Sequence, residues 1–469
     1  MTLSSRFLVA ALGSLMLTAG LRAAEVTSAT PAVTNSAAAT SGSAAANSAG
    51  TAILRDFFAE PDAGQRAALA AKFAAVAPKS WDDLRAMLHR AAVYGDLKPG
   101  RPTFQTKGEG VVPAINYVLR VPANYKSDGG AGWPLVIACH AMGGTGEGFV
   151  GFVENLLGPD VENYLVACPD SPDGGDFHAT RVVEEYPLAV LDDVRRRANV
   201  DSNQTILMGY SKGGYTVWLT ALFSPGEWAG VVPMSGFPLN QAASAGATIY
   251  LPNVLDLSIQ SHWGEKDILA GQTQGTNTFN RDVVAEMKRL GAKKYEGLEY
   301  PGEGHGLTLK TAKVRAFVAA ARRNPFPEQG HLIFHAAWQG RAWYVRVVAA
   351  ARPDFDFSKQ VKVSISSPEE LPQAVRAYFS KAAFDLQVRL RAVDNTISVM
   401  EKDLQEMEIE LPAEKLDWTK PMRVLVNSRP IFAGKRAPDY AELLETARRT
   451  YDFERLVAGR VKWAAGQAQ

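Results

Sequence analysis

One stretch constrains the fold of this chain more than any other: a short apolar run followed by a serine that has a glycine two residues before it and another two residues after it. Residues 205–209 are largely apolar and of the right length for one buried strand, and a helix-compatible run begins at Tyr215. Between them, residues 209–213 read Gly-Tyr-Ser-Lys-Gly, the Gly-x-Ser-x-Gly pattern of a sharp strand-to-helix turn. The serine backbone in such a turn is strained, so its neighbours must be small. The pattern predicts a nucleophile elbow at Ser211.

Strand-like and helix-like runs alternate on both sides of this turn. Strands are expected at 115–121, 134–139, 164–168, 230–236, 254–259 and 295–300, and helices at 179–198, 279–290 and 309–322. Some of these strands are apolar throughout, as burial on both faces requires. The alternation predicts an α/β fold with a mostly parallel sheet and crossover helices.

The N-terminal residues have the features of an export signal. Arg6 provides positive charge, residues 7–17 are apolar, and Ala23 or Ala24 provides a small residue for cleavage, so we predict a signal peptide over 1–24. The apolar run is too short for a membrane span. Residues 25–50 are mostly Ala, Ser, Thr, Asn and Gly, which predicts a flexible linker. The mature protein is therefore expected to be periplasmic or secreted, without a stable membrane anchor.

Two further segments flank the α/β region. Residues 51–108 have helical spacing of apolar residues, with Ser80 as an N-cap, and predict a small helical segment. Residues 326–469 alternate polar and apolar positions and predict a β-rich module, with a turn at Asn427–Ser428 and a terminal helix over 440–449 that packs back on it. The α/β domain is assigned to 109–325.

Charge and composition argue against several classes of partner. The chain has 50 basic and 49 acidic residues, so nothing favours a polyanion such as nucleic acid. The C-terminal module shows no P-loop and no metal-binding Cys/His spacing. The Asp-rich loop at 170–178 fits no calcium-binding pattern and is interpreted as a solvated turn. We expect no metal and no organic cofactor.

The two cysteines, Cys139 and Cys168, each end an apolar run. An exported protein can pair two such residues. Buried thiols also occur as small hydrophobic groups in neighbouring central strands, and this is the interpretation we favour.

Two loops that follow later strands contain residues that could activate Ser211. The strand at 254–259 precedes Gly264-Glu-Lys-Asp267, and the strand at 295–300 precedes Gly304-His305-Gly306. With the elbow and the loop His140-Ala-Met-Gly-Gly144, these motifs resemble the α/β-hydrolase superfamily over about 110–325. Among its subfamilies the chain is most similar to secreted esterases related to polyhydroxybutyrate depolymerases, feruloyl and acetylxylan esterases, and dienelactone hydrolases.

The resemblance implies a role for each of these residues. Ser211 would be the nucleophile, His305 its base and later an acid, and Asp267 the group that orients the imidazole. The backbone N–H groups of Lys212 and Met142 would form the oxyanion hole. The commoner loop begins His-Gly, whereas this chain has His140-Ala141, which leaves the identity of the second donor open.

Other candidates for these roles have weaker positions. Asp256 lies within the expected strand and Glu265 is misplaced in the turn. His331 and His335 lie beyond the last helix, so we interpret them as surface or interface residues. His140 is interpreted as a scaffold of the oxyanion loop that could also meet substrate, and His262 as a neighbour of the acid. Tyr210 and Trp263 could line the substrate pocket or equally serve in packing.

The sequence thus predicts an exported serine esterase that acts on a small-molecule or polysaccharide-linked ester. One alternative is a serine peptidase of the prolyl-oligopeptidase type, although no propeller domain precedes the catalytic one. Another is a carbohydrate- or surface-binding protein with a secondary hydrolase domain. In that case the aromatic residues of the C-terminal module would form a binding platform or fill a core: Phe334, Trp338, Trp343 and Tyr344.

Overall fold

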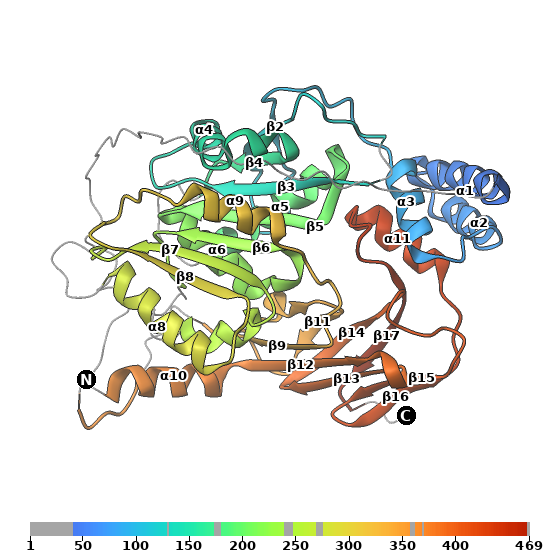
Figure 1. Cartoon of the computed structure of the whole chain (residues 1–469). Helices are drawn as coiled ribbons and strands as arrows, with labels where there is room; N and C mark the ends of the chain where they lie inside the picture. The colour runs from blue at the N-terminus through green and yellow to red at the C-terminus, as the bar shows by residue number, and fades with distance from the viewer. Residues whose placement is uncertain are drawn as a thin grey trace.

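An eight-stranded sheet forms the centre of the molecule (Figure 1). The computed structural model describes residues 41–128, 131–172, 180–238, 247–268, 275–356, 362–367 and 370–466. The strand order is β1-β2-β4-β3-β5-β6-β7-β8; β3 to β8 run parallel, whereas β1 and β2 pair antiparallel with their neighbours. The bounds are β1 Thr103–Gln105, β2 Asn116–Arg120, β3 Trp133–Cys139, β4 Leu165–Pro169, β5 Val200–Tyr210, β6 Gly230–Met234, β7 Ser258–Gly264 and β8 Tyr295–Tyr300.

Helices cover both faces of this sheet, because its parallel strands are joined by crossovers. Helices α5 (Arg181–Arg197), α6 (Lys212–Phe223) and α8 (Thr276–Arg289) pack on one face. Helices α4 (Gly146–Leu157) and α9 (Thr311–Ala320) pack on the other. The mostly parallel α/β fold predicted from the sequence is confirmed.

The two cysteines show how the sheet divides its side chains between two cores. Cys139 ends β3 and joins the core under α5 and α6, whereas Cys168 in β4 joins the core under α4 and α9. Successive side chains of a strand point to opposite faces, so the two thiols lie on opposite sides of the sheet. Both are buried and unpaired. Burial raises the pKa of Cys139 to about 12.

The C-terminal module is β-rich, as the alternating sequence predicted, and its strands form two sheets. One has the order β10-β11-β14-β17 and the other β16-β15-β13-β12-β9. All pairs are antiparallel except β13 with β15. The bounds are β9 Gln329–Phe334, β10 Arg341–Ala342, β11 Val345–Ala350, α10 Leu371–Ala382, β12 Phe384–Arg391, β13 Thr396–Lys402, β14 Leu404–Pro412, β15 Met422–Val426, β16 Arg429–Gly434, α11 Tyr440–Thr450 and β17 Val457–Ala464.

The α/β domain and this module share one continuous apolar core. The short helix η4 (Thr248–Val254) lies between them. Within it, Asn253 donates to the carbonyls of Leu222 and Ile333 (2.8 and 2.9 Å) and accepts the N–H of Ile333 at 2.7 Å. The Tyr250 hydroxyl lies 2.7 Å from Nδ1 of His335. The C-terminal module therefore packs directly against the α/β domain, through a shared core and through the hydrogen bonds of η4.

The N-terminal helices lie at one edge of the molecule, next to α11 and far from α8 (Figure 1). They are α1 (Ser41–Ala59), α2 (Ala63–Ala74) and α3 (Trp81–Ala91), and they bury their apolar faces together with α11. His89 of α3 bonds to Asn199, just before β5 begins. These helices thus contact the amino end of the strand whose carboxyl end leads into Ser211.

Several expected boundaries differ from the structure. Residues 41–50, predicted as flexible linker, belong to α1, while residues 1–40 lie outside the described part of the chain. Strand β1 falls within the predicted helical segment 51–108 but extends the large sheet. The strand expected at 254–259 is β7, which begins at Ser258 because the preceding apolar residues form η4. Helix α11 packs on the N-terminal helices as well as on β17.

No helix in the described ranges is long and apolar enough to cross a membrane. Within the same ranges, no group of three or more His, Cys, Asp or Glu side chains is placed to hold a metal ion.

Candidate active site

Ser211 occupies the turn between β5 and α6 at the carboxyl edge of the sheet. Its φ of 54° is in the left-handed region that non-glycine residues rarely adopt. The neighbouring glycines are required by space: a Cβ on Gly209 would lie 2.3 Å from the carbonyl oxygen of Gly213, and one on Gly213 would lie 2.0 Å from that of Cys139. The backbone N–H of Ser211 donates to the Met234 carbonyl at 2.8 Å. The predicted elbow is therefore present, and it is held by β3 and β6.

Ser211, His305 and Asp267 lie in hydrogen-bonding contact. The Ser211 Oγ is 2.7 Å from His305 Nε2, and His305 Nδ1 is 3.0 and 3.1 Å from the two carboxylate oxygens of Asp267. Because a carboxylate accepts, Nδ1 carries the proton and Nε2 is left to accept the serine hydroxyl. Asp267 is buried, whereas half of the His305 side chain is exposed. The three residues predicted from separate loops are thus brought together.

The loops that provide Asp267 and His305 fit closely against each other. A Cβ on Gly264 would lie 2.0 Å from the carbonyl oxygen of Gly304, so only glycine allows this approach. The N–H of Lys266 donates to the Glu303 carbonyl at 2.8 Å. Asn277, in the first turn of α8, donates its N–H to the Asp267 carbonyl at 3.1 Å. These contacts fix the acid relative to the imidazole.

His140 supports the loop predicted to provide an oxyanion donor. Its Nε2 accepts the N–H of Ser171 at 3.1 Å, so Nδ1 carries the proton and donates to the Ala141 carbonyl at 2.6 Å. The Gly144 N–H donates to the same carbonyl at 3.0 Å. Both ring nitrogens are engaged and the ring is buried, which favours the interpretation of His140 as the scaffold of this loop. Met142 lies in the same loop with an exposed side chain.

Tyr210 and Trp263 both make contacts within the protein. The Tyr210 hydroxyl donates to the His305 carbonyl at 2.7 Å and accepts the Leu307 N–H at 3.0 Å. Trp263 is buried, and its indole N–H donates to Glu299 at 3.2 Å. The structure therefore favours packing over substrate contact for Trp263 and places Tyr210 against the loop of His305.

The remaining histidines are occupied elsewhere. His262 is fully buried next to Tyr300, and burial lowers its pKa to about 4. His335 lies between Tyr250 and the Phe379 carbonyl, and burial lowers its pKa to about 4 as well. His331 pairs with Asp385 at 2.9 Å. The predicted role of His331 and His335 as surface or interface residues is consistent with these positions. His178 lies outside the described residues.

The aromatic residues proposed as a carbohydrate platform do not form one. Phe334, Trp343 and Tyr344 are buried in the shared core, and only Trp338 is partly exposed, with Arg181 4.7 Å above its ring. Phe334, Trp343 and Tyr344 thus fill an ordinary core, which was the other interpretation of this pattern. The binding-platform hypothesis based on these four residues is therefore wrong.

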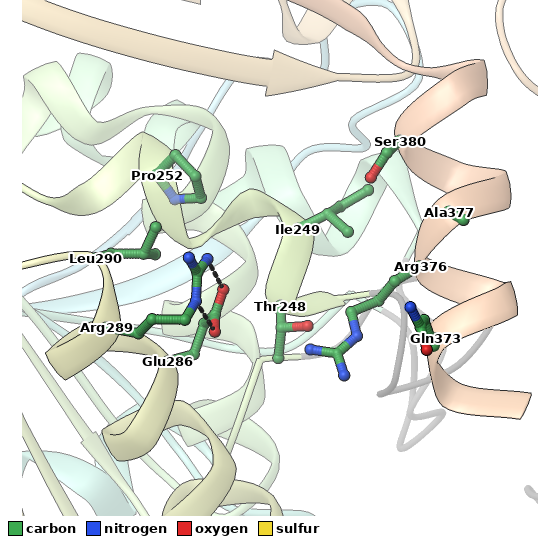
Figure 2. A pocket seen from close by; sticks show the side chains of 10 residues that line it. All are labelled: Thr248, Ile249, Pro252, Glu286, Arg289, Leu290, Gln373, Arg376, Ala377 and Ser380. Carbon is green, nitrogen blue, oxygen red and sulfur yellow. Dashed lines mark hydrogen bonds and ion pairs between the residues drawn. The ribbon is translucent and has the colours of Figure 1, made fainter. Parts of the chain in front are cut away.

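A hollow away from Ser211 lies between η4, α8 and α10 (Figure 2). Its volume is about 530 Å³, and Arg289, one of its two arginines, is bonded to Glu286 (2.8 and 2.6 Å). The hollow is lined by the last turn of α8, whereas Asp267 is hydrogen-bonded to the first turn of that helix. A helix of 14 residues separates the two by about 20 Å. This hollow is therefore separate from the site around Ser211.

One residue of the site was not predicted. Ser235 follows β6, has a φ of 49°, and its hydroxyl donates to the His305 carbonyl at 2.8 Å. The available signal was its position: it is a small polar residue directly after an apolar strand whose carboxyl end borders the elbow.

The sheet, the elbow at its carboxyl edge and the chain order Ser211, Asp267, His305 together define an α/β-hydrolase fold. No protein-family model matches the sequence, and no curated protein matches it.

Solved structures that resemble the chain include several esterases. One is a thermostable esterase (20% identity, 48% of this chain and 63% of that chain, TM-score 0.36). Another is an acetyl xylan esterase from Aspergillus awamori (16% identity, 46% of this chain and 99% of that chain, TM-score 0.36). A third is a ferulic acid esterase from the anaerobic fungus Anaeromyces mucronatus (12% identity, 50% of this chain and 94% of that chain, TM-score 0.37). The chain thus spans less than two thirds of the thermostable esterase. At these identities the similarity concerns the fold alone.

Proposed function

We propose that this protein is an exported serine hydrolase that cleaves carboxylic esters through an acyl-enzyme. The observation that carries the proposal is the contact of Ser211 Oγ with His305 Nε2 at 2.7 Å, on a strained elbow, with Asp267 behind the imidazole. A free serine hydroxyl is a weak nucleophile, and an adjacent base is what activates it.

The chemistry follows from this geometry. Ser211 attacks the ester carbonyl carbon while His305 Nε2 takes the hydroxyl proton, and Asp267 stabilises the imidazolium that forms. Collapse of the tetrahedral intermediate breaks the bond to the alcohol oxygen, which receives that proton from His305. A water molecule, deprotonated by His305, then attacks the acyl-enzyme and releases the carboxylic acid and free Ser211.

The oxyanion of each tetrahedral intermediate would be stabilised by two backbone N–H groups. Lys212 is the residue after the nucleophile and the first of α6, where the helix dipole favours negative charge. Met142 would supply the second N–H from the loop that His140 holds.

The test is the initial rate of hydrolysis of p-nitrophenyl esters of increasing acyl length by the mature protein and by Ser211→Ala. We expect turnover by the wild type and a loss of several orders of magnitude in the variant. Equal rates in both would refute Ser211 as the nucleophile. Export is tested separately, by locating the protein after cell fractionation and sequencing its N-terminus, which we expect to begin near residue 25.

A further inference from the structure

The carbonyl oxygen of His305 accepts two side-chain hydroxyl groups. Tyr210 donates to it at 2.7 Å and Ser235 at 2.8 Å. Tyr210 lies at the end of β5 and Ser235 directly follows β6, so the ends of two neighbouring central strands hold the same backbone atom. Most backbone carbonyls pair with backbone N–H groups, and two hydroxyl donors at one carbonyl are unusual.

These two residues are themselves held firmly. The Tyr210 hydroxyl also accepts the Leu307 N–H at 3.0 Å, so it contacts the loop on both sides of Gly306. Ser235 is fully buried, and its N–H donates to the carbonyl of buried His262 at 2.8 Å. Burial raises the pKa of Tyr210, which keeps its hydroxyl protonated and able to donate.

The same strand end also holds the nucleophile. Met234, the residue before Ser235, accepts the Ser211 N–H at 2.8 Å. Two consecutive residues at the end of β6 therefore hold two parts of the site. The Met234 carbonyl accepts the N–H of Ser211, and the Ser235 hydroxyl donates to the carbonyl of His305. The imidazole of His305 is otherwise half exposed and lies on a loop that contains three glycines, Gly302, Gly304 and Gly306.

We infer that Tyr210 and Ser235 are positioning residues: through the His305 carbonyl they set the place of the imidazole between Ser211 and Asp267. This inference rests on the proposed function, because it gives these hydroxyls a role in ester hydrolysis. Neither touches a reacting atom. Their removal should let the loop of His305 shift, and small misplacements of a catalytic group lower the rate strongly.

The experiment uses Tyr210→Phe, Ser235→Ala and the double variant of the full-length mature protein. Phe removes only the hydroxyl, and Ala keeps a Cβ at the same positive φ, so each change isolates one donor. We expect kcat on a p-nitrophenyl ester to fall roughly tenfold in each single variant and roughly a hundredfold in the double variant, with KM unchanged. A purely structural role would instead lower the thermal midpoint and leave kcat of the folded fraction intact.

Tyr300→Phe is the matched control. Its hydroxyl accepts the backbone N–H of Lys310 at 3.0 Å and lies 3.0 Å from Nδ1 of His262, so the change removes a buried hydroxyl near the site that is bonded to neither the Ser235 nor the His305 side chain. We expect its kcat to equal that of the wild type. An equal loss in Tyr300→Phe and Tyr210→Phe would overturn the inference, because the effect would then belong to the general stability of this region.

A second measurement does not depend on turnover. The downfield proton resonance of the His305 Nδ1–H, identified by its loss in His305→Ala, reports the contact with Asp267. We expect it to shift and broaden in the double variant and to stay unchanged in Tyr300→Phe. An unchanged resonance and unchanged kcat in the double variant would refute the positioning role. If the wild type hydrolyses no ester, the proposed function fails, and the resonance still tests whether the two hydroxyls place the imidazole.

Discussion

Arg323 and Asp452 form an ion pair with two hydrogen bonds across the junction of the α/β domain and the C-terminal module, with both N–O distances 2.7 Å. Both side chains are almost fully buried. Burial by itself would raise the pKa of Asp452, but Arg323 and Arg195 outweigh it and hold this pKa well below its ordinary value. Nearby Glu227 behaves alike: burial opposes its ionisation, yet Arg195, Arg341 and Arg455 lower its pKa to about 2.

Asp452→Asn should destabilise the protein strongly, because it removes the carboxylate that accepts both hydrogen bonds from buried Arg323 and leaves Glu227 as the nearest counter-charge. Loss of one partner of a buried pair typically costs about 3–5 kcal/mol. Urea unfolding followed by tryptophan fluorescence would measure the change. Asp417→Asn, which removes the partner of Lys420 in a solvent-exposed pair, should leave the midpoint unchanged. Equal midpoints for Asp452→Asn and wild type would contradict the importance of this junction.

The free energy of unfolding should fall between about pH 6.5 and pH 4. Burial lowers the pKa values of His262 and His335 to about 4 in the folded state, whereas unfolded histidine titrates near about 6.5. In this window the unfolded state binds more protons, so the stability present above about pH 6.5 is lost as the pH falls, by up to roughly 3 kcal/mol per histidine. Urea unfolding at a series of pH values tests this. In His335→Gln the free energy of unfolding should fall less steeply with decreasing pH than in the wild type. An identical slope in the two proteins would contradict the contribution of His335.

Gly213→Ala should disrupt the elbow although it places a better helix former in a helix. The added Cβ would lie 2.0 Å from the Cys139 carbonyl oxygen, so β3 and α6 would have to separate. We expect a clear drop in the thermal midpoint together with loss of ester hydrolysis. Gly151→Ala in α4 is the matched control: its Cβ meets nothing within 4 Å, so the midpoint should hold or rise. An unchanged midpoint and unchanged ester hydrolysis in Gly213→Ala would contradict the close approach of β3 and α6.

Ser211→Ala, His305→Ala and the double variant should have nearly the same residual kcat. Residues of a triad act as a unit, so removing the second after the first adds little. Single-variant losses that multiply in the double variant would show that the two residues act separately. Rates on one p-nitrophenyl ester at saturating concentration are sufficient for the comparison.

The thiols of Cys139 and Cys168 should resist alkylation in the native protein. Both are buried, on opposite faces of the sheet, and burial raises the pKa values of both. Since the thiolate is the reactive form, labelling should require unfolding. Mass spectrometry after iodoacetamide treatment, with and without denaturant, would count the modified thiols. A reductant should leave the thermal midpoint unchanged; a lowered midpoint would indicate a disulfide.

The sequence predicted the centre of the fold well, because the signals there are local. The apolar run before Ser211 and the glycines beside it specify a buried strand and a tight turn without reference to distant residues. The turn at Asn427–Ser428 was predicted for a similar reason, and both residues have positive φ, as a two-residue hairpin turn between β15 and β16 requires.

Predictions were poorer where distant partners decide the structure. Strand β7 contains the polar run Gln260-Ser261-His262, which no period-2 pattern predicts as buried. It is accommodated because each side chain finds a partner far along the chain: Glu296, Asn280 and Tyr300 respectively. Likewise, nothing local to Ser235 indicates that its hydroxyl meets the carbonyl of His305.

The packing of α11 against the first three helices has a consequence for the order in which the chain can fold. Ribosomes release α1 to α3 before all other described elements, yet these helices bury Phe58 and Phe73 against Phe453 and Tyr440. Their apolar faces therefore stay open until almost the whole chain has been made. Chaperones that hold a nascent chain have a natural target here, and any transcript cut short before α11 would yield a product with this surface uncovered.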